Sequence, residues 1–228
     1  MTPPALRVFS TLALAGAIGK LSPRFRGARL ETTLLPTTLV AQRIRAGERA
    51  DVAIVSSAAI DELAREGFLE PGRTDLVKSL VGIAVRTGAP RPDISTVDAL
   101  VATLLAAQSV AVSRAGASGI AFAALLQRLG IAGQVRTVVI PSGFTAELAA
   151  RGEAELAVQQ ISELMAVPGV EVVGAFPPGA ECAAVFSAGV SARGAMQAEA
   201  RAFVAMLASG AAASTFRANG LEPVAKLA

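Results

Sequence analysis

The sequence contains no histidine, tryptophan or tyrosine, and Cys182 is its single cysteine. The missing histidines exclude triads and cysteine-histidine pairs that depend on that residue, and with them nearly all zinc sites. A single cysteine excludes an internal disulfide and a paired-thiol redox centre. Cys182 is expected to be unreactive because no second thiol or histidine can activate it. We therefore expect no metal and no cofactor.

Charge is also scarce. Charged residues make up 17% of the 228 positions and the formal net charge is +3. The basic residues are scattered and lack the interleaved aromatics of single-strand binders, so nucleic acid is not an expected partner. No apolar run reaches transmembrane length, and Met1 leads into the first strand without the regions of a signal peptide. The expected location is cytoplasmic as given, or periplasmic if a leader was removed.

Hydrophobic residues, in contrast, make up 53% of the chain, which is enough to form the cores of two lobes. Short apolar runs alternate with helical patterns, and this alternation predicts an α/β protein with mostly parallel sheets flanked by helices. A Pro/Gly-rich break at 86–92 is interpreted as the crossing into a second lobe. Lobe I is expected to comprise 1–84 plus 184–228, and lobe II the inserted 85–183. The ligand cleft is expected between the lobes, outside the carboxyl ends of the strands.

The segment 109–122 organises the second lobe. It predicts a strand over Val110–Val112, a turn over Ser113–Gly119, and then the start of a helix. Backbone N–H groups and the positive end of a helix dipole favour a small anion at such a place. The alternative is an ordinary strand-to-helix loop, because the segment matches neither a phosphate-binding P-loop nor a spaced dinucleotide motif.

Other helix starts follow strands with hydroxyl-bearing turns. Ser10 and Thr11 follow the first predicted strand, and Thr37 and Thr38 follow the second. A turn at 141–145 precedes another helix, and the strand predicted over 155–159 carries Gln159 and Gln160 at its end. These places are the candidate ligand contacts.

At these residues the sequence resembles the type II periplasmic binding proteins, in their molybdate/tungstate-binding (ABC transporter) branch. The resemblance covers nearly the whole chain and is specific for the fold more than for the ligand. Its carriers are VFS at 8–10, TLVAQRIRAG at 38–47, ADVAIVS at 50–56, SGIAF at 118–122 and FRANGL at 216–221.

The resemblance implies an oxyanion held by hydroxyls and helix-start N–H groups of both lobes, plus one tyrosine hydroxyl. Three departures stand out: Ala13 replaces the usual serine of the first helix, Gln160 replaces the tyrosine, and Arg114 has no counterpart. The ligand-binding residues so implied, with Arg114 and the adjacent glutamine added, are Ser10, Thr11, Thr37, Thr38, Arg114, Ala117, Ser118, Ser142, Gln159 and Gln160.

These departures favour an organic di- or tricarboxylate over a molybdate-like oxyanion. A guanidinium pairs with a carboxylate through two hydrogen bonds, and a glutamine amide both donates and accepts. Two alternatives stay open: Arg114 pointing into solvent, and Gln159 with Gln160 as structural residues of the hinge.

Two functions remain, and a stand-alone sensor is a weaker third. The first is a binding protein for a small anion, for which an ABC permease is not an expected partner without a leader. The second is a cofactor-independent isomerase of a small unsaturated carboxylate, because aconitate isomerase is similar to the same branch. Such a proton shift needs a base, and no catalytic residue is identified: Glu147 and Glu163 are candidates outside the family's site positions, while Asp51 reads as structural.

Overall fold

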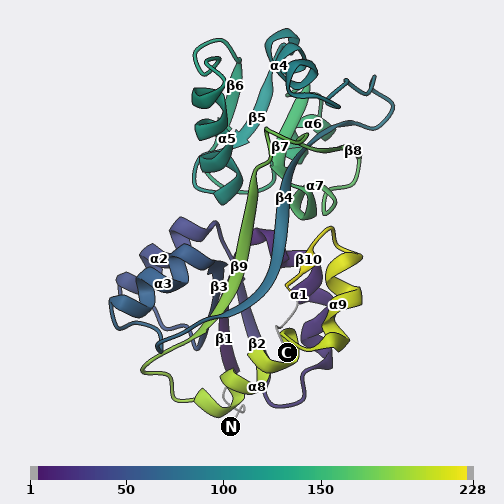
Figure 1. Cartoon of the computed structure of the whole chain (residues 1–228). Coiled ribbons are helices and arrows are strands. Elements are labelled where there is room, and N and C mark those ends of the chain that lie inside the picture. The colour runs from purple at the N-terminus through teal and green to yellow at the C-terminus, as the bar shows by residue number, and fades with distance from the viewer. Residues whose placement is uncertain (1–4, 225–228) are drawn as a thin grey trace. The chain divides into compact units, whose positions relative to one another are not determined.

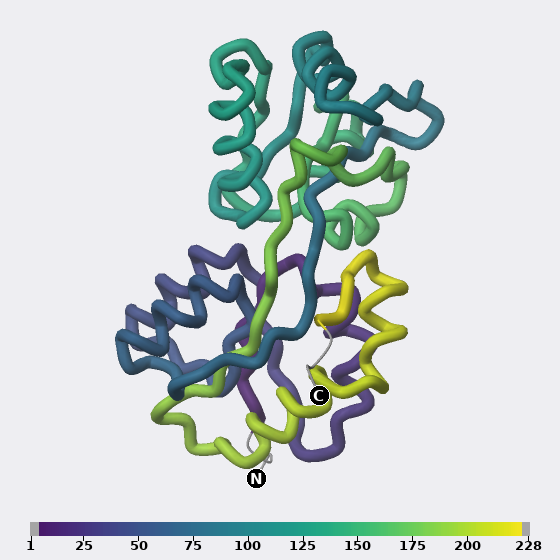
Figure 2. Tube along the Cα trace, viewed as in Figure 1, coloured from purple at the N-terminus to yellow at the C-terminus, as the bar shows by residue number. Residues whose placement is uncertain are grey.

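The computed structural model describes residues 5–224 and divides them into two compact units. Unit 1 contains the described residues up to Lys78 and from Val185 onward, and unit 2 is Ser79–Ala184. The chain passes from unit 1 to unit 2 along β4 (Thr74–Arg86) and returns along β9 (Ala183–Val190), as the colour gradient in Figure 2 shows.

Unit 1 is built on three parallel strands with one antiparallel neighbour. In spatial order the strands are β2, β1, β3 and β9, and β9 runs antiparallel to β3. A short β10 pairs with the first part of β4. The bounds are β1 (Ala5–Ser10), β2 (Arg29–Leu34), β3 (Val52–Ser56) and β10 (Glu222–Pro223).

Helices cover both faces of the unit 1 sheet (Figure 1). One face packs an apolar cluster that includes Phe9, Val40, Val55 and Leu63 against α2 and α3. On the other side lie α1 and α9, which contact each other. The helices are α1 (Ala15–Leu21), α2 (Thr37–Arg45), α3 (Ser57–Arg65), α8 (Gln197–Leu207) and α9 (Gly210–Arg217), and 3-10 turns at Leu12–Leu14 and Ser22–Arg24 flank α1.

Unit 2 repeats this plan. Three parallel strands, β6, β5 and β7, are joined by antiparallel β4, on which β8 also pairs. The strands are β5 (Val110–Ser113), β6 (Thr137–Ile140), β7 (Leu156–Gln160) and β8 (Val170–Ala175), and the helices are α4 (Val97–Ala106), α5 (Ala117–Arg128), α6 (Ala146–Ala150) and α7 (Ile161–Leu164).

Alternation along β7 divides the core of unit 2 into two layers. Leu156 and Val158 face the larger cluster with Phe122, whereas Ala157 faces a small-residue cluster with Leu164. This period of two is what a strand buried on both faces requires. The α/β class expected from the sequence is confirmed, although the crossing strands make each sheet mixed.

The boundary between the units lies inside a continuous strand. It follows Lys78 of β4, whereas the sequence interpretation placed it after residue 84. The Pro/Gly-rich segment 86–92 is an internal turn of unit 2, where Thr87 N donates to Gly169 O. A strand that continues through a boundary carries no change of composition, so the break in pattern marked a turn instead.

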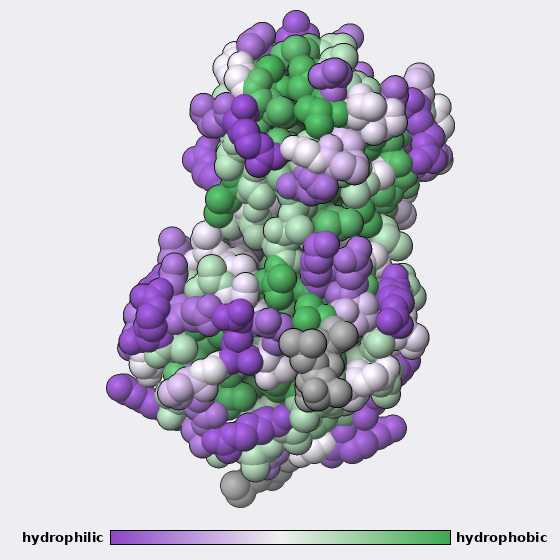
Figure 3. Space-filling model, in the orientation of Figure 1, coloured by the Kyte–Doolittle hydropathy of each residue, from purple (hydrophilic) through white to green (hydrophobic). Residues whose placement is uncertain are grey.

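The surface is mixed in character. Figure 3 shows hydrophilic side chains over both units and apolar surface over part of unit 2. Ile120, Val138 and Val139 are exposed apolar residues of unit 2. Among residues 5–224 no helix has the length and apolar character needed to span a membrane.

Cys182 lies buried near the end of unit 2. Its Sγ atom is 3.7 Å from Ala121 O, and burial raises the pKa of the thiol. A raised pKa lowers the thiolate fraction at neutral pH, which agrees with the low reactivity expected for Cys182.

Candidate functional site

In unit 1 the carboxyl ends of β1 and β2 bring the first set of predicted residues to one sheet edge. The parallel register pairs Ser10 with Leu34, so the turn after β1 lies beside the start of α2. Ser10, Thr11 and Thr37 are all buried. Ser10 Oγ donates to Thr11 O at 3.2 Å, and Thr11 N donates to Ile54 O, so part of this turn is engaged within the unit.

Thr37 differs from its neighbours because its hydroxyl is buried without a hydrogen-bond partner among the described residues. It is the first residue of α2, where the backbone N–H groups also lack intrahelical partners. Helix start and orphaned hydroxyl together are the arrangement expected of an anion contact.

In unit 2 the turn from β5 into α5 forms a second such edge. Gly116 N donates to Ser113 Oγ at 3.2 Å, which shapes the turn, and Ser118 Oγ is buried with no partner in the described chain. Gly119 is required here because a Cβ atom would overlap the carbonyl oxygen of Ser113. The missing side chain lets the first turn of α5 lie directly against the end of β5.

The strand β7 ends at the same edge, because β7 runs parallel to β5. Its last two residues have different roles. Gln159 Oε1 accepts from Thr145 N at 2.8 Å and from Thr145 Oγ1 at 2.9 Å, while its Nε2 donates to Gly143 O at 3.0 Å. Gln159 therefore holds the loop before α6 in place.

Gln160 is 2% exposed, and neither its Nε2 nor its Oε1 has a hydrogen-bond partner among the described residues. It begins α7 in an arrangement like a capping box. Of the two bonds of such a box, only Gln160 N to Glu163 Oε2, at 3.3 Å, meets hydrogen-bond geometry. The Gln160 amide is therefore buried with neither its N–H donor nor its oxygen acceptor hydrogen-bonded to the described residues.

Glu163 is a buried carboxyl without a counter-ion. It is 5% exposed, and no ion pair joins it to a cation in the described part of the chain. Burial raises the pKa of Glu163 to about 8, against the smaller opposing effects of the Gln160 amide and the Gln159 side chain. The carboxyl therefore keeps its proton at neutral pH.

The buried polar atoms that lack a hydrogen bond single out a subset of the predicted ligand residues. Within residues 5–224, seven side chains bury an oxygen or nitrogen without a hydrogen bond: Ser22, Thr37, Asp51, Ser79, Ser118, Gln160 and Ser162. Three of these were expected ligand residues, one from unit 1 and two from unit 2. Ser79 and Ser162 were not expected as ligand residues; Ser162 lies two residues after Gln160.

The remaining predicted residues lie in more open surroundings. Thr38 and Ala117 are half-buried at their helix starts, and Ser142 and Arg114 are exposed. Arg114 borders a cavity of about 490 Å³ with Ile120 and Val139, on the side of α5 that faces β6. The structure thus leaves the guanidinium hydrated.

Glu147 and Asp51 can now be separated from Glu163. Glu147 is exposed on α6 and lies 3.8 Å from Arg151, the residue that follows this helix, in an ion pair. Asp51 is buried, and its Oδ2 accepts from Arg7 N at 2.9 Å, which ties β1 to the entry of β3. Asp51 is structural, and Glu163 is the buried carboxyl with a perturbed pKa near the predicted residues.

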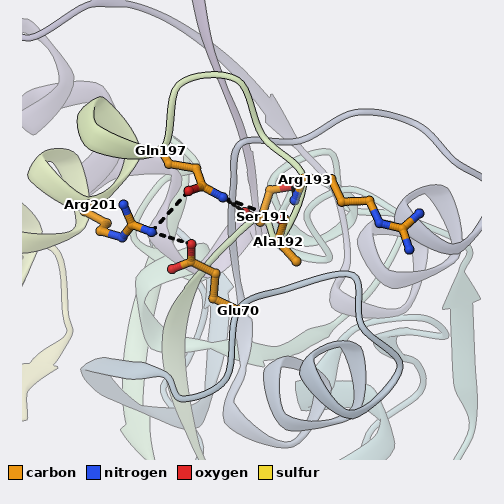
Figure 4. Close-up of polar contacts among 6 residues, drawn as sticks. All are labelled: Glu70, Ser191, Ala192, Arg193, Gln197 and Arg201. Carbon is orange, nitrogen blue, oxygen red and sulfur yellow. Dashed lines mark hydrogen bonds and ion pairs between the residues drawn. The ribbon is translucent and has the colours of Figure 1, made fainter.

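Another polar cluster, in unit 1, ties α8 to the chain after β9 (Figure 4). Arg201 Nη2 contacts Glu70 Oε1 at 2.5 Å and Gln197 Oε1 at 3.2 Å. Gln197 Nε2 reaches the carbonyl oxygens of Ser191 and Ala192, while the Arg193 side chain points away. A cavity of about 340 Å³ lies beside this cluster, and the two arginines that line it are already ion-paired, Arg201 with Glu70 and Arg73 with Asp75.

Across the described residues, no group of three or more His, Cys, Asp or Glu side chains could hold a metal ion. The candidate contacts are hydroxyls, amides and backbone N–H groups. Such donors suit an anion.

A family described as bacterial extracellular solute-binding protein matches residues 6–222. The chain belongs to this family. The description places the family outside the cell, whereas the location of this solute-binding protein itself stays a prediction.

Individual proteins similar to this solute-binding protein have two different activities. The curated aconitate isomerase of a Pseudomonas species is 35% identical over 96% of this chain and 88% of its own length. The periplasmic molybdate-binding protein of Azotobacter vinelandii has a TM-score of 0.79 at 21% identity, covering 95% of this chain and 98% of that one. A tungstate-binding protein from Desulfovibrio alaskensis has a TM-score of 0.65 at 17% identity, covering 98% and 100%. The resemblance to the molybdate/tungstate-binding branch, and its two-lobed fold, are confirmed.

Proposed function

We propose that this solute-binding protein binds one small organic carboxylate. The observation that carries the proposal is the set of orphaned buried groups at Thr37, Ser118 and Gln160. Buried polar groups without partners cost free energy, so their retention at the edges where helices begin supports a ligand that pairs with them.

The carboxylate is preferred over a tetrahedral metal oxyanion because of Gln160. A fully ionised oxyanion, like a carboxylate group itself, only accepts hydrogen bonds, but the carbon skeleton of an organic carboxylate can also carry a donor group for the acceptor oxygen of the Gln160 amide. The neutral Glu163 carboxyl nearby adds no negative charge that would repel the ligand.

We expect Arg114 to contact the ligand only from the solvent-exposed edge of the binding site. Because Arg114 is exposed, an ion pair with the ligand there is worth only about 0.2–1 kcal/mol. We expect Arg114→Ala to weaken carboxylate binding by at most about fivefold, and Arg114→Lys to bind like the wild type, because an exposed cation needs no fork geometry. Calorimetry on the three proteins tests this. A hundredfold loss in both variants would instead assign Arg114 a desolvated, bidentate contact.

A second candidate function is isomerisation of a small unsaturated carboxylate, and Glu163 is the observation that favours it. A group that transfers a proton near neutral pH works best with a pKa close to the operating pH, and Glu163 has such a pKa while Glu147 is an exposed, ion-paired carboxylate. The similarity to aconitate isomerase names the substrate to try first.

The isomerase proposal is tested by following cis-aconitate and trans-aconitate by proton NMR. Turnover is expected in the wild type and in Glu147→Gln, and Glu163→Gln should lose it by at least about a hundredfold while still binding the substrate. Binding without turnover in the wild type would leave this protein as a binding protein only.

A further inference from the structure

The amide of Gln160 bears on the chemistry of the ligand. In the interior, an amide nitrogen can be satisfied by any acceptor, but an amide oxygen needs a hydrogen-bond donor. Both atoms of the Gln160 amide are buried and unpartnered within the described chain. An anion made only of acceptor oxygens would satisfy Nε2 and leave Oε1 facing negative charge.

No donor among the described residues meets hydrogen-bond geometry with Gln160 Oε1. The neighbouring Gln159 amide is occupied by Thr145 and Gly143. The strand β7 itself, LAVQQ, carries no charged residue. The Ser162 hydroxyl, two residues further along the chain, is also buried and makes no hydrogen bond to the amide.

We propose that the ligand carries its own hydrogen-bond donor, so that the protein selects a hydroxycarboxylate through the Gln160 amide. A ligand hydroxyl donates to Gln160 Oε1 while a ligand oxygen accepts from Nε2. This inference rests on the proposed anion-binding function and narrows its ligand class. Gln160 is the specificity-determining residue.

Two ligand pairs test the proposal, each differing by one hydroxyl: succinate against malate, and tricarballylate against citrate. Affinities are measured by calorimetry at constant pH for the wild type and for Gln160→Met, which keeps the side-chain length and removes the amide. In the wild type the hydroxyl-bearing member of at least one pair should bind about tenfold more tightly. In Gln160→Met the two members should bind within about twofold of each other.

The outcomes separate this inference from the function beneath it. Equal wild-type affinities within both pairs would overturn the hydroxyl selection and leave carboxylate binding intact. A tenfold preference that survives in Gln160→Met would overturn the assignment to Gln160. If no member of either pair binds, the carboxylate function falls and takes the inference with it. The wild-type comparison decides the hydroxyl selection even if the variant does not fold.

Discussion

Glu163→Gln is expected to remove most of the pH dependence of stability between about pH 4.5 and pH 8. The pKa of Glu163 is about 8 in the folded protein, against 4.5 for an unperturbed glutamate. Below about pH 4.5 the carboxyl is protonated in both the folded and the unfolded chain, and its ionisation does not reduce the free energy of unfolding. As pH rises, the unfolded chain loses its proton first, so the free energy of unfolding falls by up to about 1.4 kcal/mol per pH unit and levels off above pH 8. The loss is roughly 3 kcal/mol at pH 7 and 5 kcal/mol above pH 8.

Glutamine imitates the protonated carboxyl and keeps an oxygen to accept from Gln160 N. The variant should therefore match the wild type near pH 4 and exceed its stability at pH 8. Urea unfolding across this range measures the effect, and Glu147→Gln, an exposed carboxyl, is the control expected to follow the wild type. Parallel pH profiles for wild type and Glu163→Gln would show that Glu163 ionises normally.

The second large effect is expected from removing two orphaned hydroxyls, one in each unit. Thr37→Ala and Ser118→Ala should each weaken carboxylate binding by about 0.5–1.5 kcal/mol, and the double variant by about 1–3 kcal/mol, or roughly 5- to 150-fold. Both hydroxyls are buried without a partner in the described protein, so the replacements break no internal bond. Neither variant should lose stability without ligand.

Calorimetry on the two single variants, the double variant and Thr32→Ala checks this prediction. Thr32 lies exposed on β2 and is the matched control. Unchanged affinity in the double variant would remove the helix starts of α2 and α5 from the binding site. A loss seen only for Ser118 would confine the site to unit 2.

Much of the architecture follows from local patterns in the sequence. The apolar runs of β1, β3 and β5 and the glycines that end α2 and α5 are sufficient to place these elements. The sequence analysis did not predict the four-residue α7 or the two-residue β10, because segments this short are too short to show a periodic pattern. The first half of β4 is hard to recognise from sequence because polar and charged residues, Asp75, Lys78 and Ser79, interrupt its apolar ones.

The sequence predicted that the candidate site lies at helix starts. It did not predict which side chains are hydrogen-bonded, which are unpartnered, or which have a shifted pKa. Gln159 and Gln160 were treated as a pair, although the period of a strand sends adjacent side chains to opposite faces. The Gln159 side chain holds the loop before α6, and the Gln160 amide has no partner among the described residues. The pKa of Glu163 depends on burial created by residues far along the chain, and no local pattern reports burial of that kind.

The most direct test of anion binding is a thermal-shift comparison of citrate, malate, succinate, molybdate and tungstate on the wild-type protein. A ligand at a hundred times its Kd stabilises the folded state by about 2.7 kcal/mol, which for a chain of this size raises Tm by roughly 5–10 °C. We expect at least one carboxylate to give such a shift and the two metal oxyanions to give none. A shift with molybdate or tungstate and none with any carboxylate would contradict the account.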